Sequence, residues 1–449
     1  MIEFLGITAV ILILYGRTYK YNKLIDDPVP REGYLWTLTE KKVDYKFYDE
    51  KRSLLATFTN IGTTIATCLA IQMCWGWQAA LLYAILPTNV SATSWTTGNY
   101  YQTTVLFVVT AYYFFIQQTW WGIILSVIFY WSALESTVSA IPLPFVLSFG
   151  YGWLASPLMI PLTLFLTGKR FTYGLKKRKE GHEKIGVRAG YIHWTRIFVI
   201  VKCISFYCFI NFWPSRLGFF HDYCKDEAKV SKISSPTRKF YIGLVMIGAF
   251  TFWGWGINPL MTVWFLLFVG LYSQYVTFGQ FLSERYMPVA NVGFCVLMAQ
   301  FLDPYPIIYA IIATLYFYRS HIYIPAWKHN RNLFSYSISN FPWASENYTN
   351  LASFYIERNQ HFQAISPLLM AVKCAELVDY KLYTNLANCY GTSGLHEKAL
   401  VYTRMAHQVA PASIKDDLQP QIDELERRIY EVEENRQWLQ SFKKIRPSK

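Results

Sequence analysis

Long, continuous apolar stretches constrain this chain more than any other feature of its sequence. Several approach the roughly 20 residues that a helix needs to cross the hydrocarbon core of a bilayer. Lipid offers no hydrogen-bond partner to a bare N–H or C=O group, so only helices or closed barrels can span it. The stretches are continuous rather than alternating in polarity, which favours helices. We therefore expect an all-α integral membrane protein.

The composition agrees with this expectation. Only 16% of the residues are charged, whereas about a quarter is usual in soluble domains. The 34 Tyr and 16 Trp residues suit a polytopic protein, because these side chains gather at the two membrane interfaces. The sequence predicts a multi-pass helical bundle of about eleven spans. They are expected near residues 3–15, 53–75, 77–88, 104–117, 119–134, 140–167, 196–213, 240–256, 258–277, 290–302 and 306–320.

The net charge of +13 narrows the range of partners. No basic run combines with an RNA- or DNA-binding pattern, so no nucleic acid is expected. Anionic membrane lipids or a lipid-phosphate substrate suit the charge better. The eight Cys form no CxxC pair and the eight His no HxxxH or HxH spacing, so no metal site is predicted.

Loop charge predicts the topology. Residues 168–196 hold nine Lys/Arg against two Glu, which places this loop in the cytoplasm by the positive-inside rule. Counting spans from it puts 89–103, 214–239, 278–289 and the C-terminal domain on the non-cytoplasmic side. Residues 16–52 fall on that side too, although they carry nine Lys/Arg beside seven Asp/Glu.

An internal repeat of 35 residues begins after about Trp343. The positions that recur are Leu351/Leu386, Ala352/Ala387, Tyr355/Tyr390, Ala364/Ala399 and Ala371/Ala406. This is the tetratricopeptide (TPR) pattern, in which small residues let paired helices approach and large ones fill the gaps. Such repeats usually bind a protein partner.

Two copies are fewer than the three or so that a stable stack needs, so a flanking helix must cap them. Residues 414–442 are expected to supply that helix. The predicted organisation is a transmembrane domain at 1–325, a short TPR α-solenoid at 326–413, and a capping helix and tail at 414–449.

Several short segments occur in the order known from one enzyme family. They are Pro87…Trp95…Gly98, Leu134-Glu135-Ser136 before Pro142, Trp213-Pro214-Ser215-Arg216-Leu217 with Asp222-Tyr223, Ser283-Glu284-Arg285-Tyr286-Met287-Pro288 with Asn291-Val292-Gly293-Phe294, and His329-Asn330-Arg331-Asn332. Together they resemble the transmembrane-and-TPR protein O-mannosyltransferases and their bacterial relatives. These are polytopic glycosyltransferases of the GT-C class.

The resemblance implies transfer of a sugar from a polyprenyl-phosphate donor to a protein acceptor, on the outer side of the membrane. A general base is then needed, and Asp26 or Asp27 is the candidate; the alternative is an ordinary Asp-Asp-Pro turn. Arg285, beside Glu284, is the candidate ligand of the lipid phosphate, or else an interfacial anchor. Arg216 is a second candidate, or else a plain surface residue.

The chain also departs from the family pattern. Leu86, Ser91, Asn99, Thr137 and Val138 stand where the family has His, Glu, Arg, Lys and Glu. A second hypothesis therefore belongs to another class: a catalytically degenerate scaffold or accessory subunit of a larger membrane complex. A transporter is disfavoured, because no repeated hydropathy halves and no charged pathway inside the spans are evident.

Overall fold

A computed structural model describes residues 2–21, 54–95, 98–151, 159–161, 163–165, 196–219, 221, 235–275, 282–375 and 378–445. Over these ranges the chain forms helices and no β-strand, apart from an isolated bridge between His221 and Leu282. The all-α prediction is confirmed. The chain divides into two compact units, Met1–Phe341 and Pro342–Lys449.

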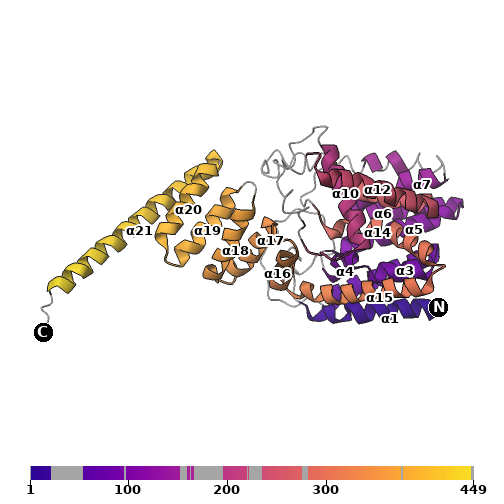
Figure 1. Cartoon of the computed structure of the whole chain (residues 1–449), viewed down its shortest axis with the longest axis horizontal. Coiled ribbons are helices and arrows are strands. Elements are labelled where there is room, and N and C mark those ends of the chain that lie inside the picture. Colours follow the sequence, from indigo (N-terminus) through magenta and orange to yellow (C-terminus); the bar gives the residue numbers. More distant parts are fainter. Residues whose placement is uncertain are drawn as a thin grey trace. The chain divides into compact units, whose positions relative to one another are not determined.

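The first unit is a bundle of helices (Figure 1). Its α-helices are α1 (Ile2–Tyr15), α2 (Leu54–Trp75), α3 (Trp77–Ile85), α4 (Val90–Ser94), α5 (Asn99–Ile116), α6 (Trp120–Ser136), α7 (Leu143–Tyr151), α10 (Arg196–Phe212), α12 (Arg238–Ile257), α13 (Pro259–Gly270), α14 (Pro288–Leu302), α15 (Pro306–Tyr323) and α16 (Asn330–Asn340). Short 3-10 turns are η1 (Gly16–Lys20), η2 (Pro87–Asn89), η3 (Val138–Ala140), η8 (Glu284–Tyr286) and η9 (Ile324–Lys328), and η7 (Leu271–Tyr275) is a π-turn.

Four helical stretches of the described chain are long and apolar enough to cross a membrane. They are Ile2–Lys20, Leu54–Trp75, Arg238–Ile257 and Pro306–Lys328. Three shorter apolar helices, Trp120–Leu134, Pro259–Ser273 and Pro288–Leu302, accompany them. By length and composition the chain thus has the helices of a membrane protein.

In helix α2, several polar side chains face the interior and several apolar side chains face outward. Its polar side chains Thr57, Asn60 and Thr64 face inward at helical spacing and are buried, while Leu55 on the outer face is 77% exposed. A water-soluble helix has the opposite arrangement, with the apolar stripe inside. The inverted pattern is typical of a helix that packs through hydrogen-bonding side chains and faces lipid.

Helix α13 starts where the sequence dictates. Pro259 occupies its first turn, and the side chain of Asn258 accepts a hydrogen bond from the Met261 N–H at 3.1 Å. Asn is a preferred N-cap, and Pro fits the first turn because its missing N–H has no intrahelical partner there. Helix α14 then packs closely on α13, since a Cβ atom added at Gly293 would lie 2.8 Å from the Met261 carbonyl.

Helices α10 and α12 run in the same direction. Phe198 contacts Phe240 near the start of both helices, and Phe212 at the end of α10 contacts Phe250 and Trp253 within α12. Two described residues from the segment between these helices lie beside α10: His221 contacts Phe206, and Lys202 donates a hydrogen bond to the Ser235 carbonyl.

This arrangement bears on the predicted topology. The span count assumed that 196–213 and 240–256 cross the membrane in opposite directions, with 214–239 on the far side from the basic loop. Arg196, where that loop joins α10, instead lies at the same end of the bundle as the start of α12. The difference arises because Phe212, at the end of α10, contacts Phe250 and Trp253 in the second half of α12, so the two helices run in parallel.

The second unit consists of antiparallel helix pairs followed by one long helix. The helices are α17 (Ser345–Ile356), α18 (His361–Cys374), α19 (Tyr380–Thr392), α20 (His396–Val409) and α21 (Ala412–Ile445). The small residues of the repeat are buried as the pattern requires: Ala352 and Ala387, Ala364 and Ala399, Ala371 and Ala406.

The two turns inside the pairs are equivalent as well. Asn359 and Gly394, 35 positions apart, both have left-handed backbones with φ of 57° and 77°. The next residues donate N–H bonds to equivalent carbonyls, Gln360 to Tyr355 and Leu395 to Tyr390, each at 2.9 Å. Asn and Gly are the residues that tolerate this conformation.

The boundary between the units lies later than the predicted 325/326 division. Helix α16 belongs to the first unit, because the hydroxyl of Ser337 accepts the Phe219 N–H and the Asn340 amide donates to the Leu217 carbonyl. His329, which the predicted division placed in the repeat segment, thus caps a helix of the first unit.

Candidate functional site

Segments far apart in the sequence meet at one end of the first unit, which we call the site end. It consists of η2, α4 with Trp95, residues 217–219 with His221, η8, η9 and α16. The ring of Phe219 ties several of them together, contacting Trp95 at 5.4 Å, Trp327 at 5.9 Å and Phe334 at 6.0 Å between centroids. The sequence motifs around Pro87, Leu217 and Arg285 are therefore neighbours in space.

Glu284, predicted beside the phosphate ligand, is buried. Its Oε1 accepts the N–H of Gly218 at 2.8 Å and lies 3.0 Å from Nε2 of His221. The side chain thus anchors the 217–221 segment to η8. The hydroxyl of Tyr323 lies near the same carboxylate.

The His221 contacts fix the position of its proton. Nε2 lies 2.6 Å from the Gly218 carbonyl oxygen and 3.0 Å from the Glu284 carboxylate. Both are acceptors, so Nε2 must carry a hydrogen. The ring lies between the aromatic side chains of Phe206 and Phe341.

Arg285 points to the other side of η8, into a cage of aromatic rings formed by Trp95, Phe219 and Tyr286. Its guanidinium carbon lies 5.5, 5.7 and 5.5 Å from the three ring centroids. Tyr286 is itself held by parallel stacking on Tyr272 at 4.3 Å. Cation–π contacts of this kind fix a planar cation without neutralising its charge. Arg285 stays partly exposed.

The remaining predicted residues lie elsewhere. Arg216 is exposed in the segment after α10. The backbone beside it is clamped by Arg319, which donates to the Pro214 carbonyl at 2.8 Å and to the Ser215 carbonyl at 2.6 Å. Asp26 and Asp27 lie outside the described residues.

Four of the positions that depart from the family pattern lie in the interior of the first unit. Leu86, Ser91, Asn99 and Thr137 are all buried, and Val138 begins η3. Thr137 pairs with the hydroxyl of Thr104 at 3.1 Å and accepts the N–H of Ser139. Neutral hydrogen-bonding groups and an apolar side chain thus occupy four positions where the family carries ionisable groups.

A neutral hydrogen-bonded network occupies the bundle beneath the site end. The Asn291 amide donates to Thr88 at 3.0 Å and to Asn89 at 2.6 Å, and Asn211 donates to Asn291 at 2.8 Å. Thr88 completes the ring by donating to Asn211. All four side chains are buried. The network joins η2, α10 and α14 and holds their register.

The sequence did not single out His221, Asn211 or Arg319, and it gave Asn291 only as part of a quoted motif. The available signals were weak: His221 precedes Asp222-Tyr223 of a quoted motif, and each Asn lies in an apolar stretch. A polar side chain in such a stretch indicates an internal partner, but sequence alone does not reveal which one.

Two segments match the N-glycosylation acceptor pattern, Asn89-Val90-Ser91 and Asn347-Tyr348-Thr349. Asn89 and Asn347 are buried. The amide nitrogen of Asn89, which would carry the glycan, donates to the Tyr83 carbonyl at 2.9 Å. Neither asparagine is available for modification in the folded chain.

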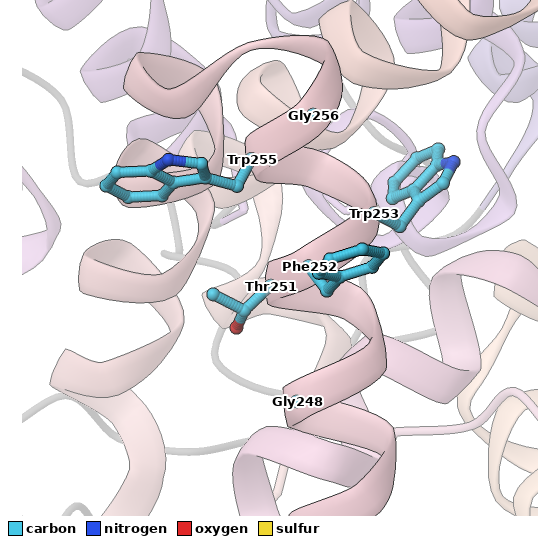
Figure 2. Close-up of a pocket in the computed structure, with 6 residues that line it drawn as sticks. All are labelled: Gly248, Thr251, Phe252, Trp253, Trp255 and Gly256. Atoms are coloured by element: carbon cyan, nitrogen blue, oxygen red, sulfur yellow. The ribbon is translucent and has the colours of Figure 1, made fainter.

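An apolar hollow of about 680 Å³ lies along α12 and is lined by Gly248, Thr251, Phe252, Trp253, Trp255 and Gly256. Figure 2 shows Trp253 and Trp255 diverging to opposite sides of the helix above Thr251 and Gly248. Trp253, which lines the hollow, contacts Phe301 near the C-terminal end of α14. The site end lies at the opposite, N-terminal end of α14, where η8 joins it. The hollow is therefore a groove on the outer face of the bundle, separate from the site end.

Comparisons with known proteins found no match: no protein family, no curated protein and no solved structure resembles this chain significantly. Within the described ranges, no group of three or more His, Cys, Asp or Glu side chains is placed to hold a metal ion. The case for a function therefore rests on the sequence motifs and on the geometry of the site end.

Proposed function

We propose that this protein is a membrane glycosyltransferase of the GT-C type, which moves a sugar from a polyprenyl-phosphate donor to a protein. The observation that carries the proposal is Arg285 at the site end, a partly exposed residue whose guanidinium is caged by three aromatic rings. A guanidinium presents a planar fork of donors that matches phosphate geometry. The donor's tail stays in the bilayer, so its phosphate must be bound close to a membrane surface.

The proposed roles follow from the positions of the side chains. Arg285 binds the lipid phosphate as the leaving group departs, and Glu284 with His221 positions η8 rather than contacting the substrate. Asp26 or Asp27 is the proposed general base, which takes the proton of the acceptor hydroxyl. The acceptor oxygen then bonds to the sugar carbon while the bond from that carbon to the phosphate breaks.

The proposed architecture is a bundle of about eleven spans followed by a TPR α-solenoid that presents the protein acceptor. The inverted polarity of α2 and the four long apolar helices support the membrane bundle. The equivalent turns at Asn359 and Gly394 support the repeat. The groove on α12 suits the acyl chains of surrounding lipid, because its lining is almost entirely apolar.

The side of the membrane is part of the proposal. Sequence counting placed the site end and the repeats on the non-cytoplasmic side. The position of Arg196 at the same end argues for the cytoplasmic side, because it closes the loop with the strongest excess of Lys and Arg. We adopt the cytoplasmic placement.

Variants of the full chain in native membranes test the enzyme. Radiolabelled sugar is supplied on polyprenyl phosphate, and its transfer to protein is measured. Asp26→Asn/Asp27→Asn should abolish transfer while leaving binding of polyprenyl phosphate intact. Arg285→Gln should weaken that binding at least about tenfold, the loss expected for a charge-assisted hydrogen bond. Arg216→Gln is the matched control, with transfer and binding retained. Unchanged transfer in the double Asp variant would refute the assignment of the base.

A second candidate function is a catalytically inactive scaffold or accessory subunit of a larger membrane complex. The closed neutral network of Thr88, Asn89, Asn211 and Asn291 favours it, because ionisable groups expected beside it are replaced by buried neutral ones. Gentle purification of the native protein distinguishes the two. Co-purifying subunits with no bound lipid-phosphate sugar support the scaffold, whereas a monodisperse particle of this chain alone carrying that lipid counts against it.

A further inference from the structure

Helix α21 is much longer than the helices on which it packs. It has 34 residues, against 14 in α20. Its first part closes the repeat unit, where Leu418 is buried against Ala406 and Ala410. Arg404 of α20 reaches Glu426 at 2.6 Å. Figure 1 shows the rest of α21 continuing past α20 within this unit.

The apolar stripe of α21 does not end where the repeats end. Leu418, Leu425 and Val432 follow one another at intervals of seven residues. Ile422 and Ile429 alternate with them, which gives the 4-3 spacing of a coiled-coil seam. Ile422 is buried, Leu425 and Ile429 are half-buried, and Val432 is 48% exposed. The seam thus emerges from the repeats and becomes uncovered along the helix.

We propose that this seam pairs with the same seam of a second copy of the chain, in a parallel two-stranded coiled coil. Leu425 and Val432 occupy d positions of the heptad, and Ile429 occupies the a position between them. Isoleucine at a with leucine at d is the combination that favours two parallel strands. The basic Arg436 at the next a position favours one defined, small oligomeric state and lowers the stability of the coiled coil somewhat.

The flanking charges select the parallel orientation. Arg428 occupies a g position, and Glu433 occupies the e position that faces it across a parallel seam, so the two copies form symmetrical Arg–Glu pairs. In an antiparallel pair, e positions face e positions, which brings Glu426 and Glu433 of the two copies together. Repulsion between like charges therefore disfavours that arrangement.

The exposed part of α21 is already ordered for pairing. Arg427 bonds Glu431 at 2.6 Å, and Arg428 bonds Glu424 at 2.7 Å, each one turn apart. Such pairs stabilise an exposed helix. A preformed helix loses less conformational entropy on association than a disordered segment does.

Cysteine crosslinking of the full chain in detergent tests the proposal. Val432→Cys and, in a separate variant, Leu425→Cys place thiols on the seam, and Glu434→Cys places one at an f position on the opposite face. On mild oxidation, both seam variants should form disulfide-linked dimers in at least about tenfold greater yield than Glu434→Cys or the wild-type chain. In a parallel coiled coil, each introduced cysteine faces the same cysteine of the second copy.

Mass measurement separates the remaining possibilities. The wild-type chain should run as a dimer, and Val432→Glu as a folded monomer with an unchanged melting temperature, because the Val432 side chain is exposed. A monomeric wild-type chain, or equal crosslinking on both faces, would overturn the proposal. Crosslinking at only one seam position would refute the parallel orientation. If the seam instead bound a different protein, the proposed self-association would be refuted.

Discussion

Nε2 of His221 lies 3.0 Å from Oε1 of Glu284, and neither side chain is exposed to solvent. The same carboxylate oxygen accepts the Gly218 N–H. Two segments more than 60 residues apart in the sequence are therefore held by one buried oxygen atom. Because Arg285 follows Glu284 directly, this contact also determines where the guanidinium lies.

Glu284→Ala should destabilise the protein by about 1–3 kcal/mol, since it removes the buried oxygen that accepts the Gly218 N–H and leaves that donor without its partner. The measurement is the thermal unfolding midpoint of the full chain in detergent. Glu284→Gln is the matched control, because its amide oxygen can still accept from Gly218 and His221. Equal midpoints for Glu284→Ala and the wild type would show that the pair is not an anchor.

Gly293→Ala should destabilise the packing of α13 on α14 by about 1–3 kcal/mol, the usual range for overpacking. The new Cβ would meet backbone atoms, 2.8 Å from the Met261 carbonyl oxygen and 3.1 Å from the Phe265 nitrogen. Gly248→Ala on α12 is the control, since nothing lies within 4 Å of its Cβ position. Denaturation of both variants in the same detergent checks this, and a Gly293→Ala curve that overlays the Gly248→Ala curve would contradict the close approach.

Arg196 and Ser215 should be accessible from the same side of the membrane. The geometry of α10 and α12 places the end of the basic loop and the site end together, whereas the alternating span count places them on opposite sides. Arg196→Cys and Ser215→Cys are labelled in sealed vesicles with a maleimide that does not cross membranes. Labelling of both from the cytoplasmic face is expected, and labelling from opposite faces would restore the original span count.

The thiol of Cys389 should resist alkylation in the folded chain. Burial raises the pKa of this thiol to about 11, because the thiolate is poorly solvated in the repeat core. At pH 8 roughly one thiol in a thousand is then ionised, against about a quarter at the ordinary pKa near 8.5. Ionisation, and with it reactivity, increases as the pH rises toward 11.

Mass spectrometry after a timed iodoacetamide pulse measures the effect. Cys389 should react roughly a hundredfold more slowly than in the same chain unfolded in urea. A second cysteine of the same unit, the partly exposed Cys374, reports whether the reagent was active. Rapid labelling of Cys389 at pH 8 would mean that the core formed by α19 and α20 is open.

The sequence by itself determined that the chain is helical, which segments are long and apolar, and where a 35-residue repeat lies. Long apolar stretches can satisfy their backbone in lipid only as helices or closed barrels, so all-α structure followed from composition and length. The 35-residue spacing likewise predicted where small residues recur in the paired helices, because that pattern depends on neighbouring residues. The left-handed backbones of Asn359 and Gly394 were found only in the structure.

Only the tertiary structure decided how the helices run and what each polar side chain contacts. Sequence counting assumes that successive spans alternate in direction, and α10 departs from this because aromatic packing places its end within the bundle. Glu284 looked like a ligand beside Arg285, yet its carboxylate bonds to Gly218 and His221. Contacts between distant segments depend on the packing of the whole bundle, and no local pattern encodes them.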